Sequence, residues 1–430
     1  MKILEVALQF LSKPAILMGL ITLVGCLMLK KPAGAVITST AKTILGLLLL
    51  NAGAGIITGA LLPLNQLLEN GFHITGVLAS GELFLARAQT EFGPIIAVVF
   101  ALSILVNVLL ARITPWKYIF LTGHHILFMA TICAATLGGT ALGQNPLVLI
   151  LISSAISGLC MTAFPALSAP FVYQITHKRD FVMGHFGTSG YVAAGFLGQF
   201  IGSPRDSAEK IHFPEWMSFL SEPLVSMSFS TWLLFLAASA ASVLVVGEQA
   251  TAAIFNSTDS WVLSSFLTAL TFAAGTGVVL MGVNMFLAEI LPAFRWYAQK
   301  VIPNALPALD CPAVFPFAPN AVMLGMLGCL IGQLLVMVAQ ALLGGRIGVV
   351  ILPSMLLSYF LGGTAGVFGN ATGGWKGALL GGLINGLMFT LLAGTAFSGI
   401  RHLDYGNTIF GDADFGLVWN ALAFLRHLIA

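Results

Sequence analysis

Long apolar runs, separated by shorter polar stretches, follow one another along almost the whole chain. Most of these runs approach the ~20 residues that an α-helix needs to span a bilayer. The pattern predicts an all-α polytopic membrane protein with about eleven transmembrane helices. The clearest runs cover residues 15–29, 43–62, 93–111, 118–139, 146–164, 231–246, 262–283, 325–343, 347–363 and 377–394.

Composition agrees with this pattern. Of the 430 residues, 58% are hydrophobic and 8% are charged, whereas an average soluble domain has roughly 25% charged residues. The longest relatively polar stretch, residues 176–230, is too short and too mixed to form a soluble domain. We therefore expect residues 1–430 to form a single integral-membrane unit, with the lipid bilayer and not a nucleic acid as its surroundings. The first run leads into Lys30, Lys31 and further spans, so it is expected to stay as a helix and not to be cleaved.

The basic residues predict the orientation of the chain, because short loops rich in lysine and arginine stay in the cytoplasm. The loops after the first, third and fifth apolar runs are basic, and they alternate onto one face of the membrane. We expect that face to be cytoplasmic. Its basic residues are Lys30, Lys31, Lys42, Arg112, Lys117, Lys178 and Arg179.

The five cysteines stand singly, without the spacing of metal ligands or of a disulfide framework. We expect them to pack as small apolar side chains, and we expect neither a metal nor a cofactor.

The two halves of the chain share an order of features. Gly53-Ala-Gly-Ile-Ile in the first half matches Gly275-Thr-Gly-Val-Val in the second, and each is followed by a less apolar loop with an acid, Glu82 or Asp310. An odd number of spans in each half would give the halves opposite topology. The pattern predicts inverted repeats over residues 15–165 and 231–395, as in many transporters whose sites lie between the repeats.

Prolines interrupt the apolar segment at residues 307–319, and an interior proline removes a helical hydrogen bond. Broken backbone at membrane depth is tolerated only inside protein or beside a watery cavity. We interpret the segment as a re-entrant hairpin with Asp310 near its turn, where an intramembrane acid marks a functional site. The alternative is that Asp310 lies in an ordinary loop.

Two Gly-His pairs stand in apolar surroundings, and they end at His124 and His185. Glycine allows a ligand to approach the backbone, and a neutral imidazole offers one donor and one acceptor. With Asp310, the two rings could hold a polyhydroxylated solute. The alternative for each ring is a hydrogen bond between helices. His125 points elsewhere on its helix and is expected to be structural.

Four segments together resemble the ascorbate-type enzyme IIC, the membrane permease component of the bacterial phosphoenolpyruvate-dependent sugar phosphotransferase system (PTS). The resemblance implies a homodimer with scaffold and core domains, an elevator-type motion, and substrate contacts at His124, His185 and Asp310. The segments are LTGHH (121–125), MGH (183–185), IPNALPALDCPAVFPFAPNAV (302–322) and GGWKGAL (373–379).

The chain departs from the ascorbate transporters of that family, in which glutamines closely follow both Gly-His pairs. Phe128 and Phe186 stand near these positions, and the loop around Glu82 also differs. We expect both rings and Glu82 to contribute to the site, since aromatic rings suit the apolar face of a sugar. Ascorbate then competes with a related sugar acid or sugar alcohol as substrate. The alternative for Phe128 and Phe186 is packing between helices.

The resemblance predicts a permease of the bacterial inner membrane that moves its substrate inward for phosphorylation by separate subunits. No soluble phosphocarrier domain is expected in this chain, which is therefore not itself an enzyme. IIB and IIA subunits are the expected partners on the cytoplasmic face. A proton-coupled secondary transporter, using Asp310, Glu82 or the histidines, is the alternative from another class. A membrane scaffold without transport activity is a third, which the broken helices disfavour.

Overall fold

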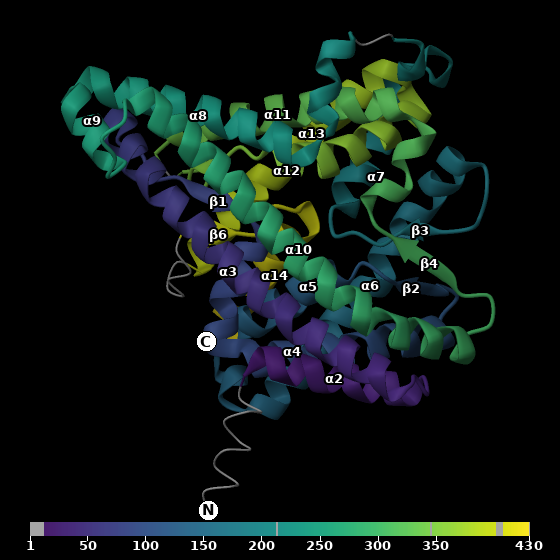
Figure 1. Cartoon of the computed structure of the whole chain (residues 1–430). Coiled ribbons are helices and arrows are strands. Elements are labelled where there is room, and N and C mark those ends of the chain that lie inside the picture. The colour runs from purple at the N-terminus through teal and green to yellow at the C-terminus, as the bar shows by residue number, and fades with distance from the viewer. Residues whose placement is uncertain (1–12, 212–213, 345, 401–406, 430) are drawn as a thin grey trace, which may run out of the picture.

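A computed structural model describes residues 13–211, 214–344, 346–400 and 407–429 of the chain (Figure 1). Most of these residues are helical. Prolines begin several helices, as at Pro146, Pro223 and Pro319, because the first helical turn does not need the missing N–H. The α-helices are α2 (Pro14–Met28), α3 (Ala33–Phe72), α4 (Gly81–Ile113), α5 (Gly123–Gly138), α6 (Pro146–Thr176), α7 (Thr188–Ile201), α8 (Pro223–Val246), α9 (Glu248–Ile254), α10 (Trp261–Val301), α11 (Pro319–Leu342), α12 (Met355–Leu357), α13 (Gly363–Ile400) and α14 (Ala413–Ile429).

Seven of the described helices are long and apolar enough to cross a membrane, and three shorter ones are also apolar. The prediction of an all-α polytopic membrane protein is therefore confirmed. The predicted run 347–363 is, however, not a single helix. It contains strand β5 (Ile351–Leu352), the short α12 and a π-helical turn before α13. Pro353 has no N–H to give to a helix, and Ser354 begins a new turn by accepting the N–H of Leu357 at 3.3 Å.

Helices α3 and α10 cross closely in opposite directions. Gly46 faces Gly282 and Gly53 faces Gly275, so a Cβ on Gly46 would lie 2.6 Å from the carbonyl oxygen of Gly282. A Cβ on Gly53 would lie 2.8 Å from the carbonyl oxygen of Gly275. Small residues allow membrane helices to approach to this degree. The two matching Gly-x-Gly motifs of the sequence therefore meet each other at this crossing.

Among the described residues, six short strands form two separate parallel sheets, which the apolar pattern did not predict. In one sheet β1 (Val77–Ala79) lies between β5 and β6 (Thr408–Ile409). In the other, β4 (Leu306–Leu309) lies between β2 (Tyr118–Phe120) and β3 (Val182–Met183). Each central strand thus pairs with two strands from the other half of the chain, and the two halves interlock.

The proline-rich segment 307–319 is a strand followed by two 3₁₀ turns, and not a pair of short helices. After β4, the side chain of Asp310 accepts the backbone N–H of Cys311 at 2.7 Å and begins the first turn, Cys311–Ala313. The second turn covers Phe315–Phe317, and α11 begins at Pro319. Asp310 therefore lies at the turn of the segment.

Buried apolar side chains form two main core clusters. The larger one gathers residues from α3, α4, α5 and α10, and the second gathers residues from α7, α11 and α13. In Figure 1, α2 and α4 lie in the lower part of the molecule and α11 and α13 in the upper part. The ends of β2, β3 and β4 lie between them.

Candidate functional site

The C-terminal ends of three parallel strands bring together the polar residues singled out in the sequence. His124 follows β2, His185 follows β3 and Asp310 follows the central strand β4. The Nε2 atom of His124 lies 3.8 Å from Oδ2 of Asp310, and Nε2 of His185 lies 3.7 Å from Oδ1 of Asp310. Because parallel strands end at the same edge, the pairing of β4 with both neighbours produces this arrangement.

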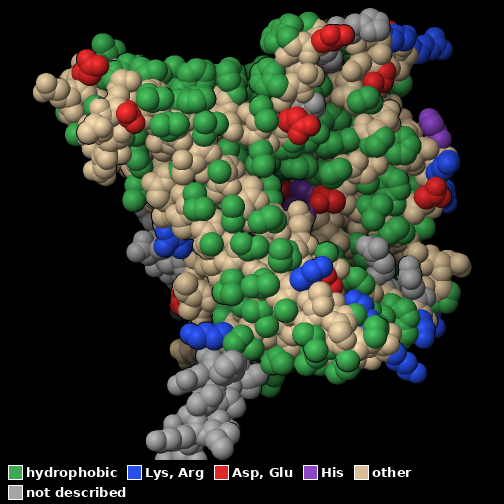
Figure 2. Space-filling view, in the orientation of Figure 1, with side chains coloured by type: hydrophobic (Ala, Val, Ile, Leu, Met, Phe, Trp, Pro, Cys, Tyr) green, Lys and Arg blue, Asp and Glu red, His purple; other side chains and the backbone are tan. Residues whose placement is uncertain are grey.

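A cavity of about 530 Å³ opens beside Asp310, within the roughly 300–1,000 Å³ of ordinary small-molecule sites. His124 and Asp310 line it, whereas His185 lies behind Asp310 and is buried. Figure 2 shows a hollow near the middle of one face, with histidine and acidic surface at its base. The lining residues are Leu121, Thr122, Gly123, His124, Asn284, Leu287, Ala288, Leu291, Pro292, Leu309 and Asp310.

Backbone N–H groups fix the tautomers of two buried histidines. The N–H of Gly187 donates to Nδ1 of His185 at 3.1 Å, and the N–H of Phe186 donates to Nδ1 of His125 at 3.2 Å. A neutral imidazole has one donor and one acceptor, so each ring carries its hydrogen on Nε2. The N–H of His185 consequently faces the carboxylate of Asp310, with Nε2 3.7 Å from Oδ1.

The same hydrogen bonds disfavour a metal centre at the buried histidines. His125, His185 and Asp412 lie close enough to share an ion, and so do His185, Asp310 and Cys311. A metal takes a lone pair from the imidazole ring. In both rings Nδ1 already accepts a backbone N–H and Nε2 carries the hydrogen. In this arrangement the rings of His125 and His185 therefore offer no free lone pair to an ion.

Two buried acids near the C-terminal end belong to the same cluster, and the sequence interpretation missed them. Asp412 follows β6, and its Oδ1 lies 3.5 Å from Nδ1 of His185 and 4.0 Å from Nε2 of His125. Its side chain is 9% exposed, and this oxygen has no hydrogen-bond partner in the described part of the chain. Asp414 accepts the N–H of Ser189 at 3.0 Å. Two acids in one apolar stretch, GDADFG (411–416), were the available signal.

The structure corrects the predicted aromatic wall of the site. Phe128 and Phe186 are buried, and neither ring lines the cavity. The Phe186 ring stacks on Phe120 with centroids 4.9 Å apart, and Phe128 packs against Phe410 at 5.3 Å. Phe128 lies one helical turn beyond His124 on the same face of α5, with ring centroids 5.7 Å apart, and is buried. Both rings pack between elements, which was the alternative left open for them.

Glu82 does not line the cavity, although its position in the first half of the chain corresponds to that of Asp310 in the second half. It stands in the first turn of α4, directly after β1, and accepts a hydrogen bond from Ser80 at 3.1 Å. It is not among the described residues that line the cavity. Its place after the central strand β1 corresponds to the place of Asp310 after β4.

Known proteins match this chain over most of its length. Residues 9–414 match the family model described as the PTS system sugar-specific permease component. A relative, the ascorbate-specific PTS system EIIC component of Mycoplasma pneumoniae (strain ATCC 29342 / M129 / Subtype 1), is 27% identical over 417 residues. The match covers 86% of this chain and 63% of that protein, so the chain spans less than two thirds of the relative's length. Because the family match covers nearly the whole chain, the protein belongs to the sugar-specific permease components of the phosphotransferase system.

Proposed function

We propose that this protein is an enzyme IIC that carries ascorbate, or a related sugar acid or sugar alcohol, into the cell. The observation that supports this best is the carboxylate of Asp310 at the cavity edge, flanked by His124 and His185. A carboxylate accepts hydrogen bonds from hydroxyl groups, and His124 can donate or accept. His185 holds the carboxylate in place from behind.

The charge of the site favours an uncharged member of this substrate group. The described cavity lining contains the acid Asp310 and neither lysine nor arginine. A carboxylate without a cationic partner in the lining disfavours an anion such as ascorbate relative to a neutral polyol. We therefore place a sugar alcohol ahead of ascorbate.

Calorimetric titration of the purified protein with a sugar alcohol series, neutral hexoses and ascorbate tests this order. The expected result is tighter binding of a neutral polyol than of ascorbate. Tighter binding of ascorbate at every ionic strength would contradict the charge argument without removing the permease assignment.

The mechanism that we propose is an elevator-type motion in a homodimer of the bacterial inner membrane. On one side the cavity is lined by α10, which contributes to the larger core cluster. On the other side it is lined by Asp310, whose neighbour Cys311 belongs to the second cluster. A relative movement of these two clusters, as scaffold and core domains, would carry a solute held between them. IIB and IIA subunits would then supply the phosphoryl group at the cytoplasmic face.

The inverted repeats also remain a proposal, and the strands support longer boundaries than 15–165 and 231–395. Strands β1, β2 and β3 of the first half have counterparts β4, β5 and β6 in the second, in mirrored sheets. We extend the repeats to include β3 and β6, together with the helices that follow them.

A proton-coupled secondary transporter is the second candidate, and the buried Asp412 favours it. Its Oδ1 faces Nδ1 of His185 at 3.5 Å, and both atoms are acceptors unless one group carries an additional proton. If protons drive transport, a pH gradient alone should sustain uptake in vesicles. Replacement of Asp412 by Asn should then abolish that uptake while substrate binding persists.

A further inference from the structure

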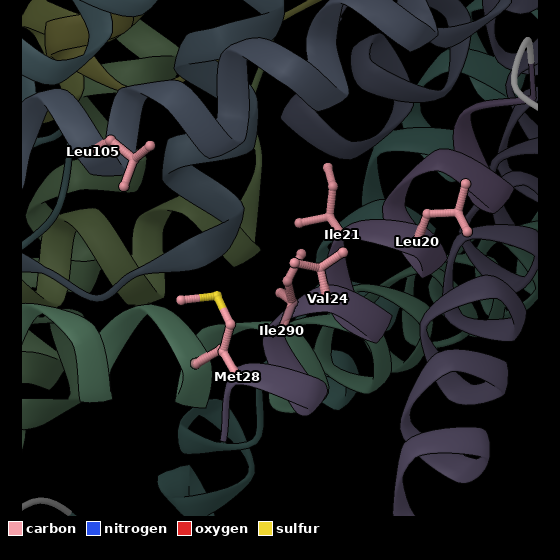
Figure 3. A pocket seen from close by; sticks show the side chains of 8 residues that line it. Leu20, Ile21, Val24, Met28, Leu105 and Ile290 are labelled. Atoms are coloured by element: carbon pink, nitrogen blue, oxygen red, sulfur yellow. The ribbon is translucent and has the colours of Figure 1, made fainter. Parts of the chain in front are cut away.

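An apolar groove of about 520 Å³ lies on the outer surface between α2, α4 and α10. Five residues of α2 line it, among them Val24 and Met28, with Leu105 of α4 and Ile290 and Ala293 of α10. Figure 3 shows Leu105 across the groove from the side chains of α2. Val24, Met28 and Leu105 are exposed large hydrophobics, as expected of a surface that faces lipid chains.

The three helices that form the groove run in the same direction. Helices α2 and α10 are both antiparallel to α3. Helix α2 contacts α3 through a hydrogen bond between the Oγ1 atoms of Thr22 and Thr43 at 2.9 Å, and α10 contacts α3 at the glycine crossing. The start of α2 faces the first half of α4, because a Cβ on Gly93 would meet Pro14. Leu105, three turns later in α4, faces the later part of α2. The C-terminal ends of all three helices therefore lie at one membrane face.

Each of these three ends carries positive charge. Lys30 and Lys31 follow α2, Arg112 lies in the last turn of α4 and Lys300 in the last turn of α10. The ammonium group of Lys300 lies 4.0 Å from the ring centroid of Trp296. Tryptophan and basic side chains together are typical of the boundary between the hydrocarbon layer and the headgroups. The groove thus runs parallel to the helices and so to the lipid chains, and its end near the C-termini of the three helices is flanked by basic side chains.

The acid of α10 nearest to the groove does not cancel this charge. Glu289 accepts a hydrogen bond from Ser39 at 2.6 Å and pairs with Lys42 at 3.4 Å, and Lys31 donates to the same Ser39 at 3.4 Å. Its charge is therefore balanced within the protein. Lys30 and Arg112 remain exposed to the headgroup region.

We propose that this groove binds one acyl chain of an anionic glycerophospholipid from the cytoplasmic leaflet, with its phosphate beside the exposed Lys30 and Arg112. Clusters of basic residues beside membrane helices attract anionic headgroups. A zwitterionic lipid fills the groove equally well but lacks the net charge that the basic cluster selects. The site therefore distinguishes lipids by headgroup and holds them by chain packing.

Native mass spectrometry of the purified full chain tests the headgroup preference. The protein is titrated with phosphatidylglycerol or with phosphatidylcholine of identical acyl chains. The wild type should retain phosphatidylglycerol about fivefold more than phosphatidylcholine. The double variant Lys30→Gln, Arg112→Gln should lose this preference, whereas Lys178→Gln, on another loop of the same predicted face, should keep it. Equal retention of both lipids by the wild type would overturn the proposal.

A second pair of variants tests the groove itself. Val24→Phe places a larger side chain in the groove, and Leu27→Phe makes the same kind of change on the same helix outside the groove lining. Val24 is 55% and Leu27 59% exposed, so neither change disturbs the core. Val24→Phe should lower phosphatidylglycerol retention several-fold, and Leu27→Phe should not. Equal retention by the two variants, or an altered oligomeric state in Val24→Phe with unaltered lipid retention, would overturn the proposal.

Discussion

The Nε2 atom of His185 lies 3.7 Å from Oδ1 of Asp310, although the two residues come from different halves of the chain. Strands β3 and β4 end side by side and bring them together. Because the N–H of Gly187 occupies Nδ1 of His185, the ring presents its own N–H to the carboxylate. On this geometry we propose that Asp310 accepts a substrate hydroxyl and that His185 has a positioning role.

Replacement of Asp310 tests this assignment. Asp310→Ala should weaken substrate binding about tenfold or more, because a buried hydroxyl left without its acceptor costs ~1–3 kcal/mol. Asp310→Asn keeps an oxygen that can accept the N–H of Cys311 but offers the substrate a different polar group. It should therefore fold normally and still bind more weakly, as measured by calorimetry and thermal unfolding. Wild-type affinity in both variants would remove Asp310 from the site.

The two adjacent histidines should respond to substitution in different ways. His124 lines the cavity, so His124→Ala should impair binding and leave the unfolding temperature close to that of the wild type. His125→Ala removes the acceptor of the buried Phe186 N–H and should destabilise the fold by ~1–3 kcal/mol. Thermal unfolding and substrate titration of both variants separate the two effects. The reverse result, a stable His125→Ala protein that fails to bind, would refute this division of roles.

Phe186 should affect stability and not substrate choice. Phe186→Gln buries an amide in an aromatic cluster and should lower the unfolding temperature far more than Phe186→Leu, since buried polar groups need partners. Neither variant should bind ascorbate more tightly than the wild type does. A Phe186→Gln protein of normal stability with improved ascorbate affinity would show that the ring reaches the substrate.

The glycine crossing of α3 and α10 offers a matched pair of substitutions on one helix. A Cβ at Gly53 meets the backbone of α10, whereas a Cβ at Gly55 meets nothing within 4 Å. Gly53→Ala should therefore destabilise the protein by ~1–3 kcal/mol. Gly55→Ala should be neutral or stabilising by up to ~1 kcal/mol. Equal unfolding temperatures of the two variants would contradict the close helix packing.

The sequence was sufficient for the fold class and for picking out part of the candidate site. Length and hydropathy determine which segments prefer lipid, so the helical membrane architecture could be read directly from the apolar runs. His124, His185 and Asp310 could be singled out because polar groups are costly in apolar surroundings. The structure places all three within one cluster.

What the sequence could not provide depends on contacts between distant segments. Strands of two to four residues carry no periodic pattern, and β1 pairs with β5 and β6 only after the two halves meet. Asp412 gains its significance from His185, which approaches it through the fold. The burial of the Phe128 and Phe186 rings behind the cavity also depends on distant segments, because Phe128 packs against Phe410 and Phe186 stacks on Phe120.

Uptake by reconstituted vesicles is the most direct test of the central claim that this chain is a phosphotransferase permease. Vesicles that contain the purified protein are supplied with a radiolabelled sugar alcohol or ascorbate, with or without the soluble phosphocarrier subunits and phosphoenolpyruvate at the cytoplasmic face. We predict that accumulation requires the subunits and yields phosphorylated solute, and that Asp310→Ala abolishes it. Accumulation of unmodified solute, driven by a pH gradient without these subunits, would contradict the account.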